Sequence, residues 1–301
     1  MLSYAFIALH LSILFAGFTG VLGRLITLNE GLLVWYRVMM ASGFFLLYLA
    51  ISRGQIRLGF KDIFRIAWVG LLLSIHWLLF YGSIKYSNVS IGVVCFASVG
   101  FFTAIIDPFW SKRAFSIREV AFSLLTILGI ALIFHFDTRY QVGIILGILS
   151  AIAASVLTIE TRRVGSDYPP MTFLFYEVLS SFVIMSAILP IYLAIFPVET
   201  IAPSVSDLIY LLLLSSFCTV GLFYFQLEAL KDLSAFTVNL SFNLEPVYSI
   251  ILAMIIFHEA KDLNFSFYIG LFLICLSVLL QSYFHWKSYQ KLQKSAAARA
   301  R

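Results

Sequence analysis

Long apolar stretches alternate with short polar breaks along most of this chain. Each apolar stretch continues for about 20 residues, the length of a helix that crosses a bilayer, without the every-second-residue alternation of a barrel strand. The pattern predicts ten spans, at 4–26, 32–52, 63–84, 89–110, 117–135, 142–161, 171–193, 206–229, 236–257 and 264–284. We therefore expect an all-α polytopic membrane protein.

The composition agrees with this class and excludes others. Of the 301 residues, 61% are hydrophobic and 12% are charged, whereas about 25% are charged in an average soluble domain. Cys95, Cys218 and Cys275 all lie in apolar stretches, which indicates packing rather than a disulfide or a metal site. The sequence has no phosphate-binding loop, dinucleotide fingerprint, metal-ligand pair or nucleophile elbow, so we expect no cofactor, no metal and no catalytic residue.

The distribution of Lys and Arg predicts an orientation. If the N-terminus is cytoplasmic, the basic residues on the inner side are Arg53, Arg57, Lys61, Arg65, Lys112, Arg113, Arg118, Arg162, Arg163, Lys231, Lys287, Lys291, Lys294, Arg299 and Arg301. The outer side then carries Arg24, Lys85, Arg139 and Lys261. This asymmetry predicts a plasma (inner) membrane protein with both termini in the cytoplasm. The basic tail, 285–301, is expected to face anionic lipid rather than nucleic acid.

The ten predicted spans also suggest an internal repeat. A shift of 146 residues aligns the third, fourth and fifth spans with the eighth, ninth and tenth, and places Lys85 on Lys231. Because a repeat of five spans is odd, the second copy must enter the membrane upside down. We predict inverted five-helix units at 1–135 and 142–284.

The ninth span carries Pro246-Val247-Tyr248-Ser249 and ends at Phe257-His258-Glu259. Together with the length and the repeat, these residues resemble the EamA-type members of the drug/metabolite transporter superfamily. The first half departs from the family pattern, since Gly100 stands where proline is usual and Lys112-Arg113 where a Gly-Glu pair is usual. The resemblance implies secondary transport, with a central cavity between spans one, three, four, six, eight and nine.

Polar residues inside spans are costly and are therefore candidates for a binding site. In the third span, Gly70, Ser74, Trp77, Tyr81 and Lys85 share one helical face, which suits either an amphipathic ligand or a helix–helix contact. The ninth span contributes further polar and aromatic positions. The predicted substrate-binding residues are Ser74, Trp77, Tyr81, Asn239, Asn243, Glu245 and Tyr248.

Five ionisable residues in the spans have their own expected roles. Glu245, near the middle of its span, is either a proton-coupling or cation-binding carboxylate, or a structural glutamate bonded to a neighbouring helix. His76 lies away from the third-span face and is left out of the site. Arg37 is expected to pair with an outer acid such as Glu30 or to bind an anionic substrate group. Glu160 and Glu177 are expected at the cytoplasmic interface, solvated or paired with neighbouring arginines.

These features favour a secondary-active transporter of a small metabolite, an amino acid or similar amphipathic solute, that works by alternating access and exports its substrate. Its partners would be the solute, the lipid bilayer and a coupling proton. One alternative is a membrane-embedded enzyme acting on a lipid-linked substrate, which would need His, Asp or Arg clustered at one membrane face. The sequence shows no such cluster, so we expect no enzyme activity. The other alternative is a channel or a purely structural protein.

Overall fold

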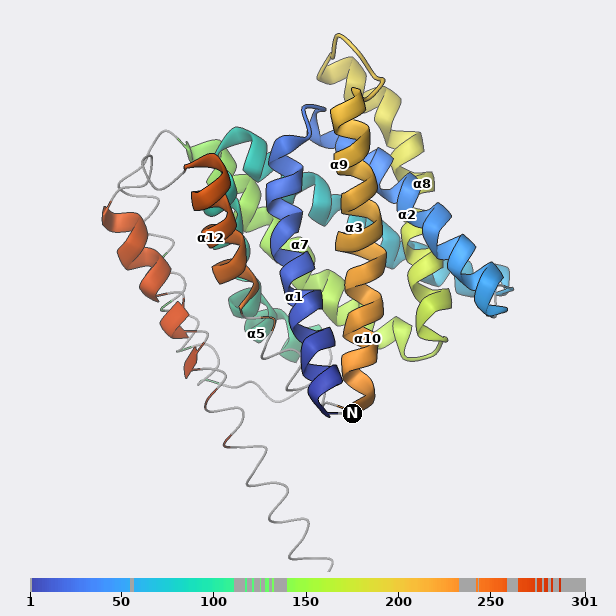
Figure 1. Ribbon diagram of the computed structural model, residues 1–301, viewed down its shortest axis with the longest axis horizontal. Coiled ribbons are helices and arrows are strands. Elements are labelled where there is room, and N and C mark those ends of the chain that lie inside the picture. Colours follow the sequence, from blue (N-terminus) through green and yellow to red (C-terminus); the bar gives the residue numbers. More distant parts are fainter. Residues whose placement is uncertain are drawn as a thin grey trace, which may run out of the picture.

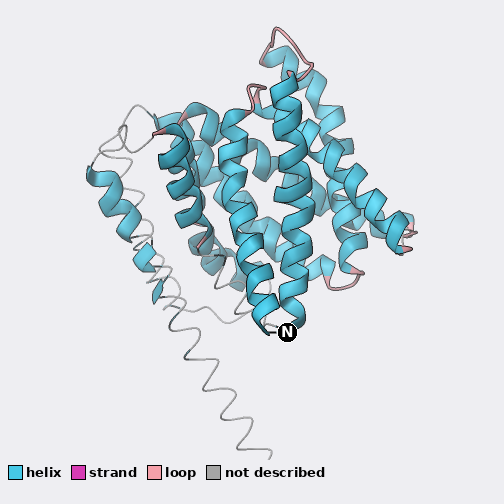
Figure 2. Ribbon diagram, viewed as in Figure 1, coloured by secondary structure: helices cyan, strands magenta, loops and turns pink. Residues whose placement is uncertain are grey.

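In the part of the chain that it describes, the computed structural model consists of helices and the loops that join them (Figure 2). It describes residues 2–54, 57–110, 140–232, 244–258 and 265–273, together with 117, 121, 125, 128, 129, 132, 242, 275–277, 279, 280, 283 and 287. The helices are α1 (Leu2–Leu25), α2 (Glu30–Ser52), α3 (Phe60–Tyr86), α4 (Val89–Phe96), α5 (Val99–Trp110), α7 (Gln141–Gly165), α8 (Pro170–Ile195), α9 (Val205–Ser215), the π-helix η2 (Ser216–Gly221), α10 (Leu222–Asp232) and α12 (Glu245–Phe257).

Seven of the described helical segments are long and apolar enough to cross a membrane. They coincide with the predicted spans one to four and six to eight, with α4–α5 forming one segment and α9–η2–α10 another. Two shorter apolar helices, Glu245–Phe257 and Phe265–Ser277, fall within the ninth and tenth predicted spans. Most of the fifth predicted span, 117–135, lies outside the described residues. The structure thus supports seven spans directly, a coarser result than the predicted ten.

The helices run between two ends of the bundle, which we name after a residue at each. The Thr27 end holds the α1–α2 loop and the long α8–α9 loop, both at the top of Figure 1. The Asp167 end holds the α2–α3 connection and the α7–α8 turn. The end of α3 reaches the Thr27 end, because Arg24 donates to the carbonyl oxygen of Ile84 at 3.4 Å.

Corresponding helices of the two predicted repeats run in opposite directions. Helix α1 finishes at the Thr27 end, whereas α7 begins there: a β-carbon built on Gly143 would lie 2.6 Å from the Ser87 side chain, just after α3. Likewise α2 begins where α8 finishes, because the Tyr192 hydroxyl donates to Glu30 at 2.6 Å. The packing partners exchange in the same way, since α3 packs on α7 and α8, while α9 packs on α1 and α2.

Glycine sets the distance between helices at two crossings. A β-carbon on Gly70 would lie 2.6 Å from the carbonyl oxygen of Glu177, so α3 can approach α8 this closely only with glycine there. Gly17 plays the same part between α1 and α12, where a β-carbon would meet Cβ of Tyr248 at 3.0 Å. Close approach of this kind favours helix association in a bilayer.

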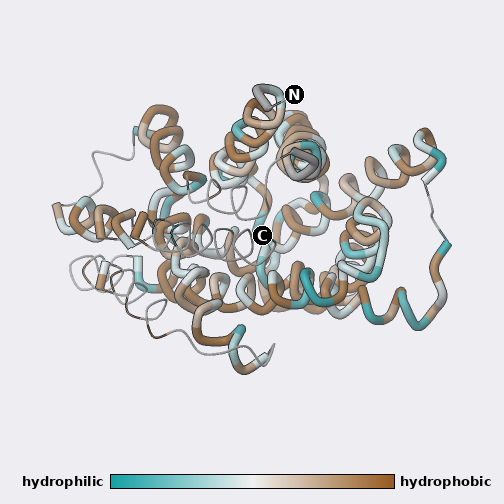
Figure 3. The backbone as a smooth tube through the Cα atoms, turned by 90° about the horizontal axis from the view of Figure 1, so that it is seen from below, coloured by the Kyte–Doolittle hydropathy of each residue, from teal (hydrophilic) through white to brown (hydrophobic). Residues whose placement is uncertain are grey.

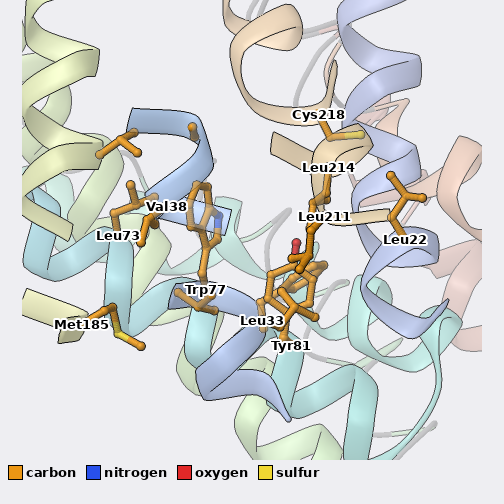
Figure 4. Packing of buried hydrophobic residues seen from close by; sticks show 14 of the residues in the cluster. Leu22, Leu33, Val38, Leu73, Trp77, Tyr81, Met185, Leu211, Leu214 and Cys218 are labelled. Carbon is orange, nitrogen blue, oxygen red and sulfur yellow. The ribbon is translucent and has the colours of Figure 1, made fainter. Parts of the chain in front are cut away.

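The apolar core lies between the helices, and further apolar side chains cover the outside. In the core, Trp77 and Tyr81 project from α3 beside Leu33 and Val38 of α2, opposite residues of α9 and η2 (Figure 4). On the outside, Phe109 is 78% exposed. Hydrophobic positions continue along much of the helices in Figure 3. A surface this apolar suits contact with lipid.

Candidate functional site

A cavity of about 260 Å³ opens between helices of both predicted repeats. Its lining comes from α1, α2, α3 and α4 in the first half and from α7, η2, α10 and α12 in the second. Its polar or charged lining residues are Thr19, Arg37, His76, Gln226 and Glu245. Its aromatic lining residues are Trp77, Phe80, Phe96, Phe223 and Phe242. The lining helices belong to spans one, three, four, six, eight and nine, the set that the family resemblance implies, with span two in addition.

Arg37 is a charged lining residue of this cavity and is only 2% exposed. Its Nε and Nη2 donate to the Thr219 hydroxyl at 3.2 and 3.1 Å, and Nη2 also donates to the Cys218 carbonyl at 3.2 Å. Its Nη1 donates to the Tyr81 hydroxyl. The guanidinium carbon lies 3.8 Å from the centroid of the Trp77 ring, a cation–π geometry. Arg37 therefore joins α2 to α3 and to the second-half helix η2.

The π-helix η2 provides two of these acceptors. The Thr219 hydroxyl donates to the carbonyl of Leu214, five positions back, at 3.1 Å. The Ser215 hydroxyl donates to the carbonyl oxygen of Arg37 at 3.2 Å. Single π-helical turns are rare and occur frequently at functional sites. Here the wide turn presents the Cys218 carbonyl and the Thr219 hydroxyl to the guanidinium.

His76, which the sequence prediction leaves out, lines the cavity. Its ring stacks on Phe96 with centroids 5.1 Å apart, and its Nδ1 lies 2.9 Å from the Ser150 hydroxyl. Helical periodicity assigns His76 to another face than Trp77, but the cavity wraps around α3 and contacts both of these consecutive residues. The available signal was the cost of a polar ring in an apolar span, which applies whatever its helical face.

The structure separates the predicted binding residues into groups. Trp77 and Glu245 line the cavity, and Tyr81 adjoins it through its bond to Arg37. Ser74 instead contacts α8, where its hydroxyl lies 2.7 Å from the Ser181 hydroxyl. Tyr248 packs against α1 in a separate apolar cluster. Asn239 and Asn243 lie outside the described residues.

The predicted ion pair between Arg37 and Glu30 is wrong, because Arg37 bonds to neutral groups and Glu30 accepts from Tyr192. Interface solvation of Glu160 and Glu177 is wrong as well, since they are 0% and 5% exposed. Glu160 pairs with Arg163 at 3.0 Å, which was the other expectation for it. These carboxylates are buried by contacts with residues distant in the sequence, such as the hydrogen bond from Trp110 to Glu160. Local hydropathy does not predict such contacts.

At the Thr27 end, Asp207 fastens the α1–α2 loop to the start of α9. Its two carboxylate oxygens accept from the backbone N–H of Thr27 at 2.6 Å and from the Thr27 hydroxyl at 2.7 Å. It also completes a capping box with Ser204 and is 1% exposed. We call Asp207, Ser204 and Thr27 the Thr27 latch. An open hollow of about 560 Å³ lies beside it, lined in part by Lys85 and Glu199.

A corresponding contact closes the Asp167 end. Asp62 is the third residue of α3, as Asp207 is of α9, and it accepts from the Tyr168 hydroxyl in the α7–α8 turn at 2.9 Å. Arg65 pairs with Asp167 in the same turn at 2.7 Å. We call Asp62, Arg65, Asp167 and Tyr168 the Asp167 latch. Each latch connects a helix start in one half to the connection after the first helix of the other half.

Comparison with known proteins identifies the family. The family model described as "EamA-like transporter family" matches the chain twice, over residues 3–135 and 141–283. The chain belongs to the EamA-like transporter family. This EamA-like protein is therefore an integral multi-pass membrane protein of a family that transports small solutes and is not enzymatic, consistent with the drug/metabolite transporter superfamily. Its cavity lies between the two matched units.

Solved structures support the fold of this EamA-like chain. One of them, titled "Crystal structure of protein", superposes with a TM-score of 0.62 at 14% sequence identity, covering 92% of this chain and 98% of the other. A likeness at that identity concerns the fold alone. No curated protein sequence matches the chain significantly. Among the described residues, no group of three or more His, Cys, Asp or Glu could hold a metal ion.

Proposed function

We propose that this protein is a secondary-active transporter that exports a small amphipathic metabolite, such as an amino acid, by alternating access. The observation that carries the proposal is the cavity between the two EamA units, with Arg37 from the first unit and Glu245 from the second in its lining. A site at the interface of two repeats can be opened to either side by moving one unit against the other.

The directions of the helices support an inverted repeat. Helices α1 and α7 run oppositely, and so do α2 and α8, as the contacts at the Thr27 end require. Inversion makes the two ends of the cavity equivalent, so that the same packing change can open either of them. The two latches, built at matching positions in opposite halves, fit this scheme.

The size and chemistry of the cavity favour a small solute. Drug-sized ligands occupy pockets of about 300–1,000 Å³, and the present cavity of about 260 Å³ lies just below that range. Its many aromatic side chains provide apolar contact, while its few polar groups can fix the orientation of a ligand. An amphipathic solute uses both kinds of surface.

Glu245 is the proposed coupling group. It begins α12 inside the cavity and has no hydrogen-bond partner among the residues that the structure describes. A carboxylate in a membrane-embedded site binds a proton or a cation more readily than it remains charged and unpaired. In the proposed cycle, protonation of Glu245 and solute binding alternate. Asn239 and Asn243 remain predicted ligands.

The proposed orientation places the Asp167 end in the cytoplasm of the plasma (inner) membrane, with both termini on that side. Arg53 and Arg65 lie toward this end, and so do Arg162 and Arg163 at the close of α7. A single cysteine at Gly54 should react with an impermeant thiol reagent only from the inner side, and one at Glu199 only from the outer side. Reaction of both from one side would contradict the orientation.

Counterflow in proteoliposomes tests the function. Vesicles loaded with an unlabelled solute should take up the labelled solute transiently and saturably, and Glu245→Gln should abolish net proton-driven flux. A channel would give flux without saturation or exchange. If no member of a panel of amino acids and related solutes shows saturable exchange, the carrier proposal fails. Net proton-driven flux that is unchanged in Glu245→Gln would remove only the coupling role.

A further inference from the structure

We infer that Arg37 is the substrate anchor, and that the solute carries a single carboxylate which Arg37 binds while its apolar body rests against the cavity's aromatic side chains. This inference rests on the proposed transport function and specifies the substrate class for the same cavity.

One N–H donor of the Arg37 guanidinium is not used by the described residues. Its Nε–H and both Nη2 donors are directed at Thr219 and the Cys218 carbonyl, and one Nη1 donor is directed at Tyr81. An arginine has five N–H donors in a planar fork. The second Nη1 N–H therefore has no acceptor among the described residues. Because Arg37 lines an open cavity, this donor is available to a ligand.

The charge of Arg37 has no counter-ion among the described residues, since Glu245 lines the same cavity but forms no ion pair with it. All its hydrogen-bond acceptors are neutral, and it forms no ion pair with any carboxylate in the described part of the chain. A buried cation without a counter-ion is strongly unfavourable, and an anion that enters the cavity would relieve that cost. Stacking on Trp77 and the bonds to Thr219 hold the guanidinium in place, so little order is lost on binding.

The rest of the cavity indicates one negative charge and not more. Arg37 is the only arginine or lysine among its lining residues within the described chain. A dianionic phosphate needs several donors, whereas a carboxylate is matched by one guanidinium. Phe80 and Phe96 supply apolar surface next to His76. The best fit is thus a monocarboxylate with a compact apolar or aromatic side group.

The experiment uses matched sets of small probes on the full chain in detergent. Each set shares one apolar body (phenylethyl, indolylethyl or isobutyl) and carries a carboxylate, a carboxamide or an amine. Binding is measured as the rise of the unfolding temperature with probe concentration, because a ligand of the folded state stabilises it. We expect a carboxylate in at least one set to bind about ten- to 100-fold more tightly than its amide.

Two variants at Arg37 and one control locate the effect. Arg37→Gln should remove the preference for carboxylate over amide, and Arg37→Lys should keep a weaker preference because it keeps the charge but not the fork. Lys61→Gln, an equal loss of charge at an exposed position, should leave the preference unchanged. Should Arg37→Gln fail to fold, Arg37→Lys still gives the result, since a smaller ratio of carboxylate to amide affinity is expected.

The outcomes separate this inference from the transport proposal. Carboxylates that fail to bind, or amides and amines that bind as tightly, overturn the carboxylate anchor whatever the transport assay shows. An unchanged carboxylate preference in both Arg37 variants overturns the role of Arg37. In either case, saturable counterflow of an uncharged or cationic solute would still support the carrier function. If no solute shows saturable counterflow, the carrier function and the carboxylate anchor both fail.

Discussion

The two ends of the bundle have latches at matching positions, but with different contacts and in different surroundings. At the Thr27 end, Asp207 is 1% exposed and bonds to the backbone and hydroxyl of Thr27 and to Ser204. At the Asp167 end, Arg65 and Asp167 have side chains 47% and 50% exposed. Buried charge-assisted hydrogen bonds contribute more than exposed ion pairs, which are screened by solvent and salt.

This difference indicates which end opens with the smaller loss of free energy. Separating the Thr27 latch removes both bonds from Thr27 to the buried Asp207 carboxylate and leaves only those within the Ser204 capping box. Separating the Asp167 latch exposes groups already close to water. The Thr27 end is therefore held closed more firmly than the Asp167 end. In the proposed orientation this is an inward-facing preference.

The largest expected effect is at Asp207. Asp207→Ala removes the bonds to Thr27 and one half of the capping box, and should cost about 2–4 kcal/mol of stability. The equivalent Asp62→Ala should cost under about 1 kcal/mol, because it loses one half-exposed hydrogen bond. Thermal unfolding of the two variants in detergent measures the difference. Equal losses at both positions would mean that the ends are equally secured.

Glycines give the second comparison. A β-carbon on Gly143 would lie 2.6 Å from Cβ of Ser87 and 2.9 Å from the Ser83 carbonyl at the Thr27 end. On Gly165, at the Asp167 end, it would lie 3.3 Å from the Phe173 ring, which can shift. Gly143→Ala should cost about 1–3 kcal/mol by overpacking, and Gly165→Ala distinctly less. A greater loss at Gly165, seen by the same unfolding assay, would reverse the order.

Two tyrosine hydroxyls give a smaller effect. Tyr192 donates to Glu30 at the Thr27 end, and Tyr168 donates to Asp62 at the Asp167 end. Tyr192→Phe should cost about 1–2 kcal/mol because it leaves a partly buried carboxylate with one bond fewer, and Tyr168→Phe about 0.5 kcal/mol. Midpoints of denaturation by a chaotrope would show both. If Tyr168→Phe is less stable than Tyr192→Phe, the Asp167 end is not the weaker of the two.

The smallest effect is expected for the exposed ion pair. Arg65→Gln should lower stability by at most about 1 kcal/mol, and the loss should shrink in high salt. Arg65→Gln should nevertheless favour the conformation of the proposed cycle in which the Asp167 end is open. Faster labelling of a cysteine placed near that end would show this shift. A loss that is large and independent of salt would show that the pair is structurally essential.

The seven spans found in the described part of the chain match the sequence prediction because hydropathy is local. The apolar stretches at 32–52 and 171–193 correspond to α2 and α8 within two residues at each end. The Arg37 site could not be predicted in this way. Its partner Thr219 lies 182 positions away, on a π-helix that breaks the assumed turn of 100° per residue. The bonds of Glu160 and the place of His76 likewise depend on which helices pack together, and helical periodicity does not carry that information.

The most direct test of the account is to lock the Thr27 end. A protein with cysteines at Thr27 and Asp207, in a background without Cys95, Cys218 and Cys275, can be cross-linked by a short bifunctional thiol reagent and released by reductant. Cross-linking should stop counterflow while leaving solute binding intact, and reductant should restore transport. Full transport by the cross-linked protein would contradict alternating access through this end.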